Sequence, residues 1–183
     1  MKNLSLTLAA LFIVINISNA QVGDSFPEMT GTSLTDEEIT VPSATQDKMT
    51  LIGIAFSKKA EDDLKTWFQP VWERFIREAD PNALIPEMKP DVNVVFIPMF
   101  TGLKRGASGS AIRKMQKDVD TKLHPNVIVY SGKMGDYEDQ LNMKEKDQPY
   151  FFVVNKKGEI IYATAGRSSM KKLNEVEELV TDY

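Results

Sequence analysis

Two continuous apolar runs on either side of an amphipathic segment constrain the fold of this chain most strongly. Residues 49–56 and 92–98 contain no charged side chain, which is typical of strands buried in the middle of a sheet. Between these runs, apolar residues recur at spacings of three and four from Leu64 to Ile76. This period predicts a helix that packs one face against the sheet, so the chain is expected to adopt an α/β fold.

The remaining segments supply further layers. Pro70 lies inside the predicted helix and is expected to kink it near Thr66, because proline lacks a backbone donor; residues 80–82, Asp-Pro-Asn, are expected to end it. In chain order, we also expect a loose N-terminal hairpin over 21–42, with a strand near 39–41. The middle of the chain is expected to form a helix over 110–123, a strand over 127–130 and one or two helical turns within 136–143. The C-terminal part is expected to form a hairpin with strands 150–154 and 159–163, and a final helix beginning at Ser168 or Ser169.

Residues 1–20 read as an export signal. Lys2 provides a basic start, residues 4–17 are almost entirely apolar, and small residues precede a cleavage point after Ala20. The alternative, a membrane anchor, is less well supported because a spanning helix needs about 20 apolar residues. We therefore expect a protein exported across the cytoplasmic membrane to the periplasm or beyond, with residues 21–183 forming a single domain.

The composition disfavours several classes of function. The chain has no cysteine, so it cannot form a thiolate nucleophile or a disulfide, and thiol reductase or thiol peroxidase chemistry is excluded. With a single histidine, His124, a metal site or a serine triad is not expected. A net charge of −4 without a dense basic run argues against nucleic acid as a partner. No cofactor is expected.

The order of these elements resembles the thioredoxin-like superfamily, especially its exported TlpA-type thiol reductases and its peroxiredoxins. Residues 22–27 are similar to the Gly-Asp-x-x-Pro opening of that branch, and residues 148–160 are similar to its proline-led hairpin. The resemblance implies a three-layer sandwich, with a central mixed sheet flanked by helices and an N-terminal hairpin extension. It also implies that Pro149 is the cis-proline beside the redox site.

The departure from this family is as informative as the match. By the resemblance, the redox cysteines would map within residues 57–65, where this chain has none. A narrower likeness, carried by residues 67–70 and 165–166, is to the mitochondrial ATP-synthase assembly factor family, which resembles a peroxiredoxin without an obligatory redox pair. The resemblance therefore implies that a cysteine-free member of this fold acts by binding or assembly.

Two groups of residues are candidate binding sites. The first is the former redox corner, which is expected to bind a protein or peptide; it comprises Ser57, Lys58, Lys59, Glu61, Trp67, Gln148 and Pro149. The simpler interpretation is that the acidic residues of the first helical turn complement the helix dipole and that Trp67 belongs to the core. The second group is a weaker anion-binding candidate at the start of a helix, with a solvated loop as its alternative; it comprises Lys104, Arg105, Ser108 and Ser110.

Three functions remain open on this evidence. The first is a redox-inactive binding protein of chaperone or assembly type, degenerate with respect to thiol reductases and peroxiredoxins. The second is a purely structural or assembly subunit, which requires a contiguous exposed apolar patch. The third is an enzyme of non-thiol chemistry, which requires Asp62, Asp63 and Arg105 to converge on one pocket.

Overall fold

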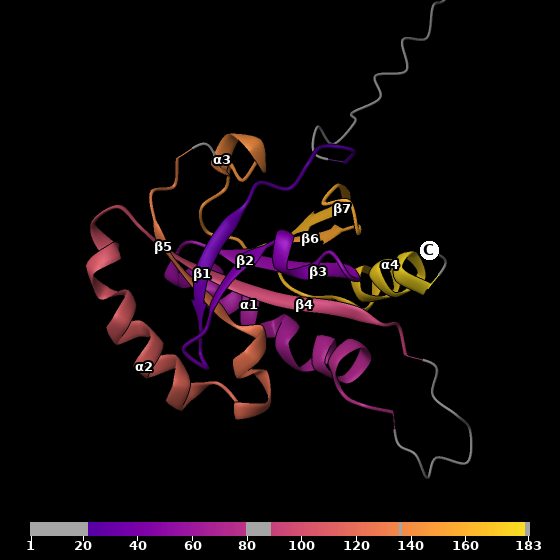
Figure 1. Ribbon diagram of the computed structural model, residues 1–183, viewed down its shortest axis with the longest axis horizontal. Coiled ribbons are helices and arrows are strands. Elements are labelled where there is room, and N and C mark those ends of the chain that lie inside the picture. Colours follow the sequence, from indigo (N-terminus) through magenta and orange to yellow (C-terminus); the bar gives the residue numbers. More distant parts are fainter. Residues whose placement is uncertain (1–21, 80–88, 136, 182–183) are drawn as a thin grey trace, which may run out of the picture.

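One mixed sheet organises the computed structural model, which describes residues 22–79, 89–135 and 137–181. Figure 1 shows this sheet running through the middle of the molecule. The strands are β1 (Met29–Ser33), β2 (Glu38–Val41), β3 (Met49–Ala55), β4 (Val92–Thr101), β5 (Ile128–Gly132), β6 (Tyr150–Val154) and β7 (Ile160–Ala165). The helices are α1 (Lys58–Val71), α2 (Ser108–Asp118), α3 (Tyr137–Gln140) and α4 (Met170–Thr181).

The strand order places the most apolar segments at the centre of the sheet. The order is β2-β1-β5-β4-β3-β6-β7, with β3, β4 and β5 parallel and the remaining pairs antiparallel. Ile52 pairs with Val95 on one side and with Phe152 on the other. Strand β3 is therefore a central strand, and all of its residues are buried. Burial on both faces explains why it needs a continuous apolar sequence.

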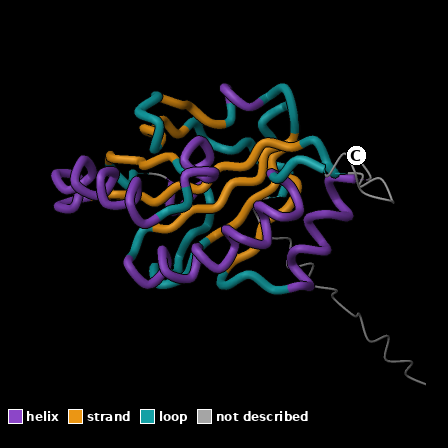
Figure 2. The backbone as a smooth tube through the Cα atoms, turned by 90° about the horizontal axis from the view of Figure 1, so that it is seen from below, coloured by secondary structure: helices purple, strands orange, loops and turns teal. Residues whose placement is uncertain are grey.

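Successive residues of the central strands enter two separate cores, because side chains alternate between the faces of a sheet. Leu51 and Phe151 pack with the apolar residues of α1, α2 and α4, whereas Ile52 and Phe152 pack on the opposite face with Phe26 and the residues around α3. In Figure 1, α3 and α1 lie on opposite sides of the sheet, and Figure 2 shows the helices crossing the strands. The predicted α/β fold with a mixed sheet and an N-terminal hairpin is confirmed.

Two helix boundaries differ from the sequence-based expectation. Helix α1 passes through Pro70 and then widens into a π-helical turn, Trp72–Ile76. Helix α2 ends at Asp118 instead of continuing to residue 123, because the Asp120 carboxylate accepts a hydrogen bond from the Lys122 amide at 3.1 Å and begins a separate 3₁₀ segment. The predicted helix end at 80–82 and the start of the 136–143 segment lie outside the described residues.

The expectation of a cis bond before Pro149 is wrong. Within the described part of the chain, the one cis peptide bond precedes Pro42. The trans form is the lower-energy form of an X-Pro bond, and the Pro149 carbonyl accepts a hydrogen bond from the Gly166 amide at 2.8 Å.

The described helices include none that is both long and apolar enough to cross a membrane.

Candidate functional site

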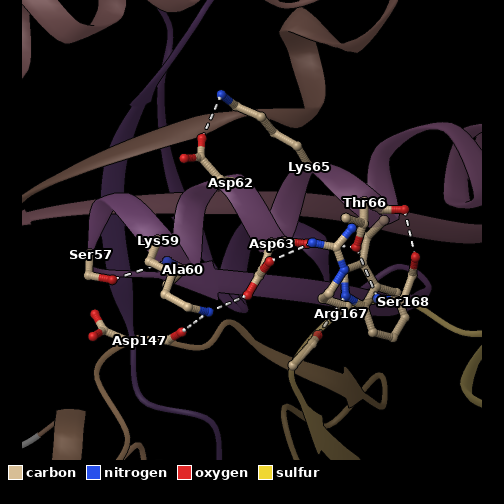
Figure 3. A network of polar contacts seen from close by, with 12 residues as sticks. Ser57, Lys59, Ala60, Asp62, Asp63, Lys65, Thr66, Asp147, Arg167 and Ser168 are labelled. Carbon is tan, nitrogen blue, oxygen red and sulfur yellow. Dashed lines mark hydrogen bonds and ion pairs between the residues drawn. The ribbon is translucent and has the colours of Figure 1, made fainter.

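Ser57 directly precedes α1, at the corner where the resemblance places the redox cysteines. Its hydroxyl accepts a hydrogen bond from the Ala60 amide at 3.1 Å, and only 6% of the residue is exposed. This is the geometry of a helix N-cap, which satisfies one of the free amides of the first turn. Figure 3 shows Ser57 at the end of the polar network along α1. In this structure, Ser57 therefore has a structural role.

The charged residues of the first turns are paired along α1. Lys58 and Lys65 both contact the Asp62 carboxylate, at 2.9 and 3.4 Å. Lys59 contacts the Asp63 carboxylate at 3.0 Å. Hydrogen bonding to the lysines lowers the pKa of Asp62 and that of Asp63 from their ordinary values. Both carboxylates are thus held in their charged form by their neighbours, as expected of a helix surface.

Helix α1 is also tied to the loop that follows β7. Arg167 in this loop donates to Asp63 at 2.9 Å, and the Trp67 indole N–H donates to the Gly166 carbonyl at 3.0 Å. The Ser168 hydroxyl donates to the Thr66 carbonyl at 2.7 Å. Proline at position 70 cannot donate to that carbonyl as a normal helical residue would, so Ser168 supplies the missing donor.

The hairpin residues of the corner lie on the same side of α1 as this loop. Lys59 donates to the Asp147 carbonyl at 3.3 Å, which brings the Gln148-Pro149 segment next to the start of the helix. Pro149 is buried and Gln148 is half-buried. Trp67 is completely buried and stacks on Phe151 with ring centroids 4.2 Å apart. Trp67 is therefore a core residue that a partner cannot touch in this conformation.

A groove lies on the other side of α1, between this helix and α2. Its volume is about 280 Å³. The α1 wall contributes Lys58, Glu61, Leu64, Lys65 and Phe68; the α2 wall, which includes the residue directly after this helix, contributes Ala111, Lys114, Met115, Asp118 and Val119; Pro98, Phe100, Lys104 and Val127 complete the lining.

Glu61 is the half-buried carboxylate of this groove. Burial raises its pKa from the ordinary value, while Lys58, Lys65 and Lys104 act in the opposite direction. The sequence-predicted corner is thus divided by α1. Lys58 and Glu61 face the groove, whereas Lys59 and the Gln148-Pro149 segment lie near the β6–β7 side.

The residues of the anion-binding candidate are engaged in different contacts. Lys104 lines the groove, but the Arg105 guanidinium donates to the Gly102 carbonyl at 3.3 Å and the Ser110 hydroxyl donates to the Ala107 carbonyl at 2.8 Å. Ser108 begins α2 and is half-buried. Of the four residues, Lys104 alone lines the groove.

The residues that the enzyme alternative requires in one pocket do not converge on the α1–α2 groove. Asp62 and Asp63 pair with different partners on two sides of α1, and Arg105 bonds its own loop. None of these three residues lines the α1–α2 groove. Within the described ranges, no group of three or more metal-ligating side chains comes together.

Sequence reasoning missed two features of this site. One is the role of Ser57, for which a signal existed: a serine directly after a strand and before a charged helical turn is typical of an N-cap. The other is the α2 wall of the groove. Its signal is weaker, since the helical spacing of Ile112, Met115 and Val119 predicts the helix over 110–123 but does not show that these side chains stay half-buried.

Comparison with solved structures identifies the fold. The C-terminal domain of a candidate thiol-disulfide oxidoreductase from Bacteroides thetaiotaomicron matches with a TM-score of 0.55 and 11% identity, over 90% of this chain and 99% of that chain. A thio-disulfide isomerase from Thermus thermophilus matches with a TM-score of 0.52 and 15% identity, over 87% and 96% of the two chains. An exposed lipoprotein thioredoxin from Streptococcus pneumoniae strain TIGR4 matches with a TM-score of 0.53 and 10% identity, over 86% and 100%. The fold is therefore thioredoxin-like, as the sequence predicted.

Sequence comparison assigns the chain to a family. No curated protein matches it significantly. A family model described as ATP10 protein matches residues 15–181, which is nearly the whole chain. The protein is thus a cysteine-free, thioredoxin-like member of the ATP10 protein family.

Proposed function

We propose that this protein is an exported, redox-inactive binding protein of assembly type, which holds a partner polypeptide at the corner formed by the start of α1. The observation that carries the proposal is the state of this corner. The scaffold is intact, but Ser57 serves as a helix cap where thiol chemistry would need a sulfur atom. An open groove lies directly beside it.

Membership of the ATP10 protein family and the absence of cysteine both support a role without redox chemistry. The character of residues 1–20 supports export. The alternative of a purely structural subunit is favoured less. Among the described residues, the large apolar side chains that are mostly exposed are Val22, Leu103 and Met170, which belong to three segments far apart in the sequence and give no support to the contiguous patch that this alternative requires.

The purified protein is expected to show no insulin reduction and no peroxide turnover above the uncatalysed rates, because neither reaction can proceed through a thiolate here. A thioredoxin with an intact cysteine pair serves as the positive control for the insulin assay, and a thiol peroxidase serves for the peroxide assay. Robust turnover in either assay would contradict the redox-inactive role.

The binding role is tested by tagging the chain in its native host, where a stoichiometric polypeptide partner is expected to co-purify.

A further inference from the structure

The α1–α2 groove has an apolar floor that the protein itself leaves partly uncovered. No side chain of α2 is fully buried. Met115 of α2, Val119 directly after this helix, and Phe68 and Phe100 opposite them are all half-buried. Helix α2 is held by these partial contacts and by a hydrogen bond from the side-chain Nε2 of Gln116 to the Leu34 carbonyl at 3.0 Å. Apolar side chains from a partner would gain burial here.

The rim of the groove carries lysines on both walls, although the protein as a whole is acidic with a net charge of −4. Lys58 and Lys65 lie on α1, and Lys104 and Lys114 lie on or before α2. Each wall adds one carboxylate, from Glu61 and from Asp118. On α1, Glu61 and the neighbouring Asp62 balance Lys58 and Lys65. The excess positive charge therefore comes from Lys104 and Lys114, which stand against one carboxylate, that of Asp118, and it makes the α2 wall complementary to negative charge.

The lysines on the two walls differ in their availability. Asp62 already contacts Lys58 and Lys65. In the described part of the chain, Lys104 and Lys114 have no carboxylate within ion-pair distance. The α2 wall is therefore where a partner's carboxylates would gain most.

The size of the groove narrows the class of ligand. Its volume of about 280 Å³ falls just below the roughly 300–1,000 Å³ typical of sites that enclose a whole small molecule. It suits a few side chains presented by a longer segment, as in the recognition of an amphipathic helix by a groove. A membrane surface would instead be met by a protruding side chain such as Leu103, which lies outside the groove lining.

We infer that the α1–α2 groove binds an acidic amphipathic helical segment of a partner polypeptide, with apolar side chains on the floor and Asp or Glu residues facing Lys104 and Lys114. This inference rests on the proposed binding function and specifies its surface and its ligand. The apolar contacts provide affinity, whereas the lysines select acidic over basic segments and orient the bound helix.

The probe is a labelled synthetic helical peptide with leucines at spacings of three and four and glutamates beside them, and binding is followed by fluorescence anisotropy. A peptide with lysines in place of the glutamates is the charge control. The acidic peptide is expected to bind at low ionic strength, more weakly in about 0.5 M salt, where charges are screened, and the basic peptide is expected not to bind.

The double variant Lys104→Glu/Lys114→Glu is expected to weaken binding of the acidic peptide by about tenfold or more at low ionic strength. The matched variant Lys156→Glu/Lys157→Glu makes the same charge change at exposed positions of the β6–β7 turn and is expected to leave the affinity within about twofold. Met115→Glu, which places a carboxylate on the floor, is expected to abolish binding even in high salt. Circular dichroism checks that each variant is folded.

Equal binding of both peptides, or an unchanged affinity in Lys104→Glu/Lys114→Glu, would overturn the inference. Binding to anionic phospholipid vesicles in preference to the peptide would overturn it in favour of a lipid surface. Self-association that is lost in Met115→Glu would overturn it in favour of a second copy. A further outcome separates the inference from the proposed function. If no peptide binds the groove, but zero-length cross-linking of amines to carboxylates joins a native partner to Lys59 on the opposite side of α1, the inference fails while the proposed function stands.

Discussion

Replacing Trp67 by alanine is expected to lower the free energy of unfolding by about 3–5 kcal/mol, the range for removing a large aromatic side chain from a core. Trp67 is completely buried and stacks on Phe151 at 4.2 Å. Its indole N–H also donates to the Gly166 carbonyl. Alanine would leave a cavity between α1 and the sheet and an acceptor without its donor, and both effects destabilise the fold.

Urea denaturation followed by circular dichroism measures this loss. Trp72→Ala is the matched control, because Trp72 lies in the next turn but is only half-buried, with the Lys122 amine 3.7 Å from its ring centroid. A clearly smaller loss is expected for the control. Trp67→Phe, which keeps an aromatic ring but lacks the N–H, is expected to cost about 1–2 kcal/mol. Equal effects of Trp67→Ala and Trp72→Ala would contradict the buried position of Trp67.

Ser168→Ala is expected to cost about 1–3 kcal/mol, the penalty for leaving a poorly solvated carbonyl without a donor. The carbonyl concerned is that of Thr66, which Pro70 cannot satisfy. Pro70→Ala restores an amide at position 70, and this amide can donate to the Thr66 carbonyl as in a regular helix. In the Pro70→Ala background, the cost of Ser168→Ala is therefore expected to shrink.

A double-mutant cycle in urea denaturation measures this coupling. Ser169→Ala is the matched control, since the Ser169 hydroxyl accepts a hydrogen bond from the backbone amide of Lys172, within its own segment, at 3.3 Å. The cost of Ser169→Ala is expected to be the same with either residue at position 70. If Ser168→Ala costs as much in the Pro70→Ala background as it does with Pro70 in place, the hydroxyl does not substitute for the missing amide.

The sequence was most informative about those parts of the fold that depend on local periodicity. The continuous apolar run over 49–56 predicted β3, and the turn near Gly158 predicted the hairpin of β6 and β7. These predictions succeed because burial on both faces and a tight turn each leave a local signal. The alternation of Ile52 and Leu51 between two cores depends on the strand period alone.

The features that the sequence did not reveal depend on contacts between distant segments. The bond from Ser168 to Thr66 joins residues 102 positions apart, and neither residue is unusual in its own neighbourhood. The groove likewise needs Lys104 and Lys114 to lie opposite Glu61, which follows from the packing of α2 on the same face of the sheet as α1. The isomer of the Gln148–Pro149 bond is a further example, since its local sequence is compatible with both forms.

The most direct measurement of the central claim is zero-length coupling of amines to carboxylates in the native host, with the products identified by mass spectrometry. The reagent joins a lysine only to an Asp or Glu that it touches. Coupling to a partner polypeptide is expected at lysines around the start of α1 and the groove, above the level at the exposed control lysines of the β6–β7 turn. The first set is Lys58, Lys59, Lys65, Lys104 and Lys114, and the control set is Lys156 and Lys157. The account would be contradicted if no lysine of the first set couples to a partner polypeptide, or if coupling at the first set is no stronger than coupling at the control set.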